Sequence, residues 1–138
     1  MPAAPRVESA SPSESDTHPT GFGFPRRYRL TQPSQFQSVL RSPAYVVRRG
    51  ALRIVANANT MHGARLGLIV GKRAVRLAHR RNLVKRVVRE TFRQNRDQLP
   101  ALDVVVQVRP NDGDLSAKRV ARWTREALRE LARRAETT

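Results

Sequence analysis

The sequence predicts an α+β fold in which helices pack on one small mixed β-sheet. Two alternating apolar patterns of strand length lie between residues 50 and 72, a nearly continuous apolar run covers residues 103–108, and helix-period patterns flank them. The predicted order is helix, strand, strand, helix, strand, helix, and residues 45–47 allow a further short strand. A chain of 138 residues supports one modest core, so we expect a single domain over residues 22–138.

The first helix follows an extended basic lead-in over residues 24–30. The run 31–34 (TQPS) is typical of a helix start with proline in the first turn. Phe36, Val39 and Leu40 then share one face at i, i+3, i+4 spacing, and Ser42-Pro43 ends the helix.

Two strands are predicted next, over residues 50–59 and 65–72, with a turn between them. In the second strand Leu66, Leu68 and Val70 occupy one face, and Gly67, Ile69 and Gly71 occupy the other. Two glycines on one face let a packed helix or a nucleic acid strand come close, and we favour the packed helix.

The second helix is the most informative segment of the chain. From Arg65 to Arg96 there are eleven Lys and Arg residues and one acid, Glu90. With about 100° per residue, one half of the helix collects the apolar residues Leu83, Val84, Val87, Val88 and Phe92. The other half collects Asn82, Lys85, Arg86, Arg89, Arg93 and Arg96.

This segregation of charge favours a polyanion as the partner. Like charges at this spacing repel, and phosphates relieve the repulsion. A solvated surface helix would normally alternate its cations with Glu at i, i+4 spacing. A membrane-surface helix would carry large aromatic anchors, and here only Phe92 is available.

The third strand, residues 103–108, is apolar enough to be covered on both faces. A turn follows at residues 110–113. The last helix, over about residues 116–134, has Val120, Trp123, Ala127, Leu128 and Leu131 on one stripe with basic residues around it.

Composition limits the remaining possibilities. Residues 1–20 contain one Arg and three acids and carry −2, so the rest of the chain carries +18 and the net charge is +16. Residues 1–21 have too few large apolar side chains to fold and are expected to be disordered. They lack a secretory signal, and no apolar run is long enough to span a bilayer, so we expect a soluble, cytoplasmic protein without cysteine chemistry.

The chain offers little for catalysis on its own. Its eight acids outside the first twenty residues are widely spread, which does not favour a two-metal site. Asp112 and Asp114 are better explained as a turn and helix cap. His18 and His62 lie in the tail and a turn, whereas His79 could contact RNA or have a capping role.

Residues 67–90 (GLIVGKRAVRLAHRRNLVKRVVRE) resemble the signature of the bacterial ribonuclease P protein component. The resemblance extends to residues 29–36 and 99–103, and covers roughly residues 24–133. The family pattern is Arg-Asn-Arg followed by Lys-Arg and Arg-Glu. Here Leu83 replaces the third residue of the triplet, so either the helix starts differently or one RNA contact has been dropped.

The resemblance implies a left-handed crossover between the parallel strands, although the general rule predicts a right-handed one. It also implies that a catalytic RNA removes the 5′ leader from precursor tRNA while the protein assists. No cofactor is expected on the protein alone, and magnesium would serve the RNA-containing complex. The implied partners are the catalytic RNA and precursor tRNA in a 1:1 complex with a monomeric protein, and no membrane is expected.

Two sets of site residues follow from the resemblance and the helical pattern. The set expected to bind the catalytic RNA comprises Lys72, Arg73, Arg76, Arg81, Asn82, Lys85, Arg86, Arg89 and Arg93. The set expected to bind the single-stranded leader comprises Arg29, Phe36 and Arg53, in a cleft between the first helix and the sheet. From its apolar stripe alone, Phe36 is better explained as a core residue.

Two other classes of protein would explain the charge. A ribosomal or other structural RNA-binding protein would not select one large RNA with activity on precursor tRNA. If the protein is a DNA-binding helix module, duplex DNA should compete with RNA for it at physiological salt.

Overall fold

A four-stranded mixed sheet forms the centre of the computed structural model, which describes residues 25–61, 63–110 and 115–136. The strands are β2 (Tyr45–Arg49), β3 (Leu52–Ala58), β4 (Arg65–Val70) and β5 (Leu102–Val108), in the spatial order β2-β3-β5-β4. β3 is antiparallel to β2 and β5, and β4 is parallel to β5. The predicted tail, His62 and most of the turn at 110–113 lie outside the described residues.

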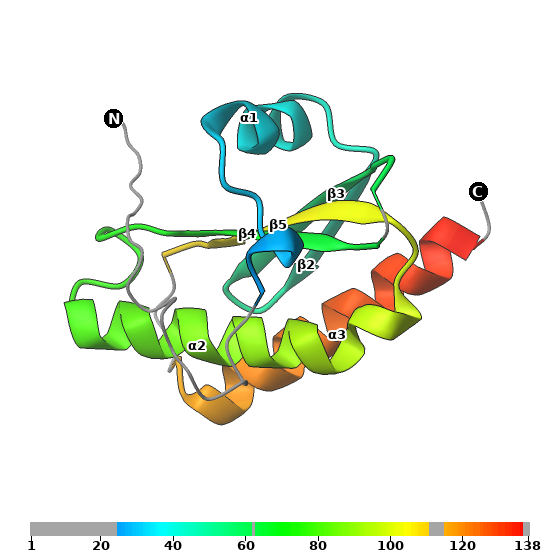
Figure 1. Ribbon diagram of the computed structural model, residues 1–138. Coiled ribbons are helices and arrows are strands. Elements are labelled where there is room, and N and C mark those ends of the chain that lie inside the picture. The colour runs from blue at the N-terminus through cyan, green and yellow to red at the C-terminus, as the bar shows by residue number, and fades with distance from the viewer. Residues whose placement is uncertain (1–24, 62, 111–114, 137–138) are drawn as a thin grey trace.

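Helices cover both faces of this sheet, as Figure 1 shows. α1 (Pro33–Arg41) lies on one face, and α2 (Ala78–Asn95) and α3 (Ala117–Glu136) lie on the other. Alternation along β3 divides the core, because Leu52, Ile54 and Ala56 pack toward α2 and α3 whereas Val55 packs toward α1. The predicted fold class and element order are confirmed, including the additional strand at residues 45–49.

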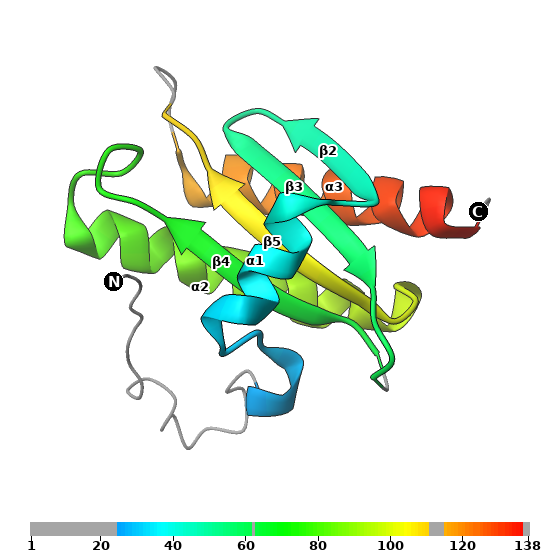
Figure 2. The same ribbon diagram turned by 90° about the horizontal axis from the view of Figure 1, so that it is seen from above.

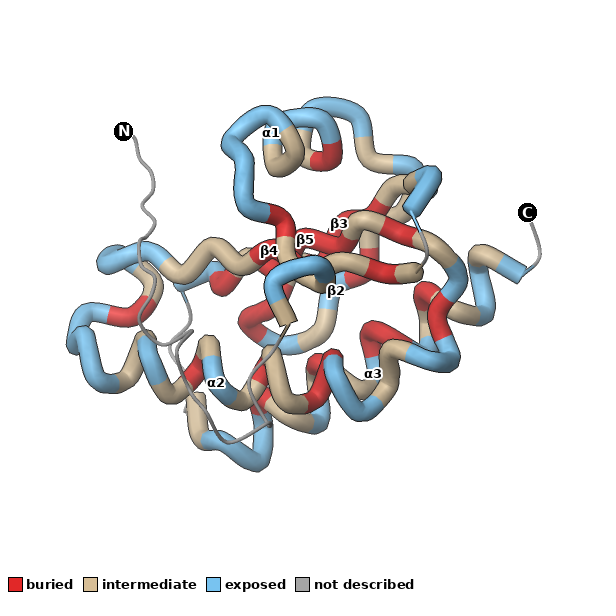
Figure 3. The backbone as a smooth tube through the Cα atoms, viewed as in Figure 1, coloured by how far each residue is buried: buried red, intermediate tan, exposed pale blue. Residues whose placement is uncertain are grey.

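β5 is the strand most completely buried. Val104, Val105 and Val106 are 0% exposed, since β5 has a strand on each side and helices above and below (Figure 3). The continuous apolar sequence of this strand is therefore explained by burial on both faces.

The segment before α1 differs from its prediction. Residues Arg26–Tyr28 form a 3-10 turn, η2, rather than extended chain. Arg29 then forms a parallel bridge with Leu66, and the amide of Leu30 donates to the carbonyl of Leu66 at 2.9 Å. Short-range composition did not reveal this turn because its packing partners lie far away in the sequence.

α1 starts as the sequence predicts. Pro33 occupies the first turn, and Gln32 and Gln35 form a reciprocal capping box in which the Gln32 amide donates to Gln35 Oε1 at 2.9 Å. This cap fixes the point at which the chain, after its bridge with β4 at Arg29, turns into α1.

The connection from β4 through α2 to β5 is left-handed. Figure 2 looks onto the sheet from the α1 side, with β5 to the right of β4 when both strands point upward and α2 behind them. A right-handed connection would place α2 in front of that pair in the same view. The handedness implied by the resemblance is thus the one observed.

Candidate nucleic-acid interface

α2 separates apolar from basic side chains in the predicted way. Val84, Val88 and Phe92 are buried, and Leu83 and Val87 are half-buried. On the opposite side Asn82, Arg86 and Arg93 are exposed, whereas Arg81, Lys85 and Arg89 are half-buried. The same helix therefore contributes to the core and presents a basic surface.

The N-terminus of α2 adds to the positive potential of this surface. Its N-cap is Leu77, which makes no side-chain capping hydrogen bond, and its first turn contains no acid. His79, Arg80 and Arg81 lie in that turn, where the helix dipole disfavours cations. A bound phosphate would accept hydrogen bonds from the uncapped amides and offset the positive charge of these side chains.

Arg81 has a structural contact besides its expected RNA contact. Its Nη1 donates to the carbonyl oxygens of Val75 and Arg76, both at 3.0 Å. These bonds hold the connection between β4 and α2 against the helix. Lys72, Arg73 and Arg76, all exposed on that connection, are thereby kept beside the basic face of α2.

Glu90 is the acid of α2, and it pairs along the helix. Arg93 donates to its two carboxylate oxygens at 3.1 and 2.6 Å, and Gln94 Nε2 donates at 3.0 Å. The hydrogen bond from Arg93 is the main cause that lowers the pKa of Glu90, and the same bond raises the pKa of Arg93. The cationic character of Arg93 is consequently offset by its neighbour.

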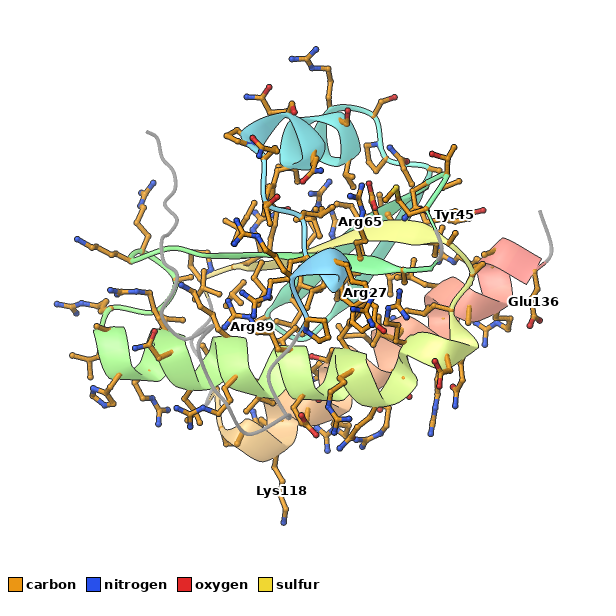
Figure 4. The ribbon with its side chains drawn as sticks, in the orientation of Figure 1. Arg27, Tyr45, Arg65, Arg89, Lys118 and Glu136 are labelled. Atoms are coloured by element: carbon orange, nitrogen blue, oxygen red, sulfur yellow. The ribbon has the colours of Figure 1, made fainter. Side chains whose placement is uncertain are left out.

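Arg96 is part of the basic stripe in sequence, but its contacts are structural. Its Nε donates to the carbonyl of Ala64 at 2.8 Å, and its guanidinium carbon lies 3.5 Å from the centre of the Tyr28 ring. Arg27 lies over the same ring at 4.8 Å. Figure 4 shows Arg27 and Arg89 on the same side of the molecule, above α2.

Leu83 lies inside a regular helix. α2 begins at Ala78 and runs unbroken to Asn95, so the replaced triplet residue sits in the second turn and is half-buried. The substitution therefore puts a half-buried apolar side chain at a position where the family pattern has arginine.

Phe36 is half-buried and packs against the small core cluster on the α1 face of the sheet. A Cβ on Gly67 would stand 2.6 Å from Phe36 Cε2, so glycine is what lets the ring approach the strand. Nothing lies within 4 Å of the corresponding position on Gly71. The packing interpretation of the two glycines is confirmed for Gly67 alone.

The three predicted leader-binding residues do not gather in one place. Arg53 is on the α1 face with Phe36, where its Nη1 donates to Gln107 Oε1 at 2.7 Å. Arg29 pairs with Leu66, and paired residues of neighbouring strands project to the same face. Since Leu66 packs in the core under α2 and α3, Arg29 lies on the α2 side of the β4 edge.

The α1 face also contains an ion pair that sequence reasoning missed. Arg65 donates to both oxygens of Asp103, at 2.8 and 2.9 Å, and Asn59 Nδ2 donates to Oδ1 at 2.8 Å. The hydrogen bond with Asp103 raises the pKa of Arg65. The pairing depends on the register of β4 on β5, for which the sequence contains no local signal.

The described residues contain neither a metal-binding cluster nor a membrane-spanning helix. His, Asp and Glu side chains in ranges 25–61, 63–110 and 115–136 form no group of three or more that could hold a metal ion. None of the helices in those ranges is long and apolar enough to cross a bilayer.

Together the fold and the basic helix define a small polyanion-binding protein of the α+β class. Comparison with known proteins identifies the family. The family model described as Ribonuclease P matches residues 24–136, so the chain belongs to this family. Members of this family are the protein component of ribonuclease P, an RNA-based endoribonuclease of tRNA processing. The protein component associates with the catalytic RNA subunit.

Individual relatives agree with this assignment. The ribonuclease P protein component of Ectopseudomonas mendocina is 40% identical over 111 residues, covering 80% of this chain and 83% of that protein. The component of Azotobacter vinelandii is 38% identical over 110 residues, covering 80% and 85%.

Solved structures show the same fold. The RNase P protein from Thermotoga maritima has a TM-score of 0.58 at 31% identity, covering 77% of this chain and 96% of that one. The Staphylococcus aureus RNase P protein has a TM-score of 0.65 at 24% identity, covering 79% and 95%.

Proposed function

We propose that the protein docks on the catalytic RNA of ribonuclease P through the basic face of α2 and its preceding connection, and thereby assists removal of the 5′ leader from precursor tRNA. We call this face the α2 surface; it comprises Lys72, Arg73, Arg76, Arg81, Asn82, Lys85, Arg86, Arg89 and Arg93. The observation that carries the proposal is the concentration of cations opposite the buried face of α2, beside a helix N-terminus without a cap or an acid. These contacts set position on the phosphate backbone, not sequence.

The leader would lie on the α1 face, where Arg53 offers a phosphate contact and the half-buried Phe36 ring borders the sheet. Arg29 would instead contact the catalytic RNA, because the register places it on the α2 side. A cationic protein between two RNAs lowers their repulsion, which should raise substrate affinity and reduce the magnesium requirement of the complex. We place this monomeric protein in a 1:1 complex in the cytoplasm.

The docking proposal is tested with Arg86→Ala plus Arg89→Ala in the complex reconstituted with the cognate RNA. At low magnesium we expect precursor tRNA cleavage to fall by roughly tenfold or more, since two phosphate contacts are lost. Arg41→Ala plus Arg109→Ala removes the same charge from exposed positions outside α2 and should retain most of the activity. A wild-type rate for the α2 variant would remove the α2 surface from the mechanism.

The leader proposal has a separate test. Affinity of the complex should be measured for substrates with and without a 5′ leader, with the wild-type protein and with Arg53→Gln. We expect the protein to favour the leader-containing substrate and Arg53→Gln to reduce that preference severalfold. An equal effect of the protein on both substrates would exclude leader binding on the α1 face.

A further inference from the structure

α3 carries a second basic stripe, which its amphipathic sequence pattern does not distinguish from an ordinary surface. With about 100° per residue, Lys118, Arg122, Arg125, Arg129 and Arg133 fall within roughly 80° of the helix circumference. The buried residues Val120, Thr124, Leu128 and Leu131 lie on the other side. Figure 4 shows Lys118 pointing away from the sheet.

Two acids of α3, Glu126 and Glu130, are turned toward β2 rather than toward this stripe. Arg49 of β2 approaches Glu126 at 4.0 Å and Glu130 at 3.8 Å. Glu130 also pairs with Arg133 and Arg134, and Arg134 Nη1 donates to the carbonyl of Val46 at 2.9 Å. The ion pairs of these two acids therefore tie α3 to the sheet edge.

Four cations remain beyond those pairs: Lys118, Arg122, Arg125 and Arg129, which we call the α3 stripe. Of the four, Arg125 is half-buried and the others are exposed. In line with them, the helix has one acid, Glu136, at its last described residue. Glu126 stands four residues after Arg122, the spacing of a helical ion pair, but it approaches Arg49 of β2 at 4.0 Å.

The N-terminal position of the stripe is also unfavourable for the isolated protein. The first turn of α3 contains Lys118 and Arg119 and no acid. The helix dipole places partial positive charge at that end, so these cations add to it. Unlike the start of α2, this end has a side-chain cap, because the amide of Arg119 donates to Ser116 Oγ at 3.3 Å. The dipole and the cations would still stabilise a phosphate there.

The α3 stripe lies on the same side of the sheet as the α2 surface. α2 and α3 pack against each other and run side by side beneath the sheet (Figure 2), opposite α1. From Lys118 to Arg129 the stripe is roughly 16 Å long, enough to follow several phosphates of an RNA strand. Its position separates it from the α1 face, to which the leader is assigned.

We propose that the α3 stripe is a second RNA-docking surface, which holds another phosphate backbone segment of the catalytic RNA that occupies the α2 surface. This inference rests on the proposed function, because it takes the same RNA as the partner. The helix layer then contacts the RNA along two lines of cations, which fixes the orientation of the protein as well as its position.

The test measures the affinity of the full chain for its cognate catalytic RNA, without precursor tRNA, as a function of salt. The variant is Arg122→Gln/Arg125→Gln/Arg129→Gln. Each lost phosphate contact reduces the slope of log K against log salt by about 0.7–0.9. We expect the slope to decrease by about 2 and affinity near 0.15 M salt to fall by roughly tenfold or more.

Two comparison variants and a stability measurement make the result specific. Arg41→Gln/Arg48→Gln/Arg109→Gln removes the same charge at other positions. It should change affinity by less than about threefold, because only long-range electrostatic attraction is reduced. Arg122→Lys/Arg125→Lys/Arg129→Lys keeps the charge and should retain the slope. Thermal unfolding of each variant verifies that α3 remains folded.

The outcomes separate this inference from the proposed function. If the α3 variant binds like the charge-matched control while Arg86→Gln/Arg89→Gln binds weakly, the α3 stripe is not a docking surface and the α2 proposal stands. If the lysine variant loses as much as the glutamine variant, electrostatic docking by α3 is overturned. Normal binding by Arg86→Gln/Arg89→Gln would instead contradict the proposed function.

Discussion

Gly67 and Gly71 show how one residue type can have two different roles in a single strand. Both glycines lie in or beside β4, and both were candidates for close approach by another element. The Phe36 ring occupies the space above Gly67, and the space above Gly71 is open. Only the first position therefore requires glycine for packing.

Replacing Gly67 with alanine should destabilise the protein. The new methyl group would overlap Phe36, whose ring is held by α1, so either the ring or the helix must shift. We expect a loss of about 1–3 kcal/mol and a decrease in Tm of roughly 5–15 °C. Gly71→Ala is the matched control and should alter stability by less than about 0.5 kcal/mol. Equal Tm values for the two variants would contradict this account of the α1 packing.

At the scale of the element, residues in and next to α2 pack in the core, hold the neighbouring segments in place and form a basic surface. Its buried side chains join the main core, Arg96 fastens the following turn to Tyr28 and Ala64, and Arg81 fastens the preceding connection. Lys85, Arg86 and Arg89 lie on the α2 surface. Glu90 limits their net charge through its pair with Arg93.

Replacing Glu90 with glutamine should strengthen binding of the catalytic RNA. The change removes a negative charge beside the α2 surface and releases Arg93 from its ion pair. The side chain of Arg93 is 40% exposed and can reach a phosphate. We expect roughly two- to fivefold tighter binding near 0.15 M salt and a steeper salt dependence. Glu126→Gln changes the net charge equally on the β2 side of α3 and should have the smaller effect. Unchanged or weaker binding by Glu90→Gln would show that Arg93 does not contact the RNA.

At the scale of the whole molecule, charge acts on stability and on binding in opposite directions. The net charge is +16, and the basic surfaces on α2 and α3 lie on one side of the sheet. Self-repulsion within this layer destabilises the folded protein when no polyanion is present.

Salt should therefore raise Tm while it lowers RNA affinity. Between about 0.01 and 0.15 M NaCl the screening length decreases from about 30 to about 8 Å, which weakens repulsion between cations on the two helices. We expect Tm of the isolated protein to increase by several degrees over this range, and the Arg122→Gln/Arg125→Gln/Arg129→Gln variant to show a smaller increase. A Tm that decreases with salt would contradict self-repulsion as a significant term.

Much of the fold and the α2 surface follows from the sequence because periodicity is a local property. The alternation in β3 and β4, the continuous apolar run of β5 and the 3.6-residue pattern of α2 each report burial of a single element. The basic face of α2 was predictable for the same reason, and family resemblance supplied the handedness of the crossover. The proline signal at the start of α1 was also sufficient.

Tertiary structure decided which faces meet and which charges neutralise one another. Arg29 was expected beside Phe36, but its bridge with Leu66 places it on the other side of β4. The Arg65–Asp103 pair and the contacts of Glu126 and Glu130 with Arg49 join residues from distant segments. Strand register and helix rotation determine these contacts, and both are properties of the assembled sheet rather than of any single segment. The sequence by itself thus determined most of the elements and the basic face of α2. Strand register determined the leader-side geometry, and the rotation of α3 against the sheet determined that Glu126 and Glu130 pair with Arg49.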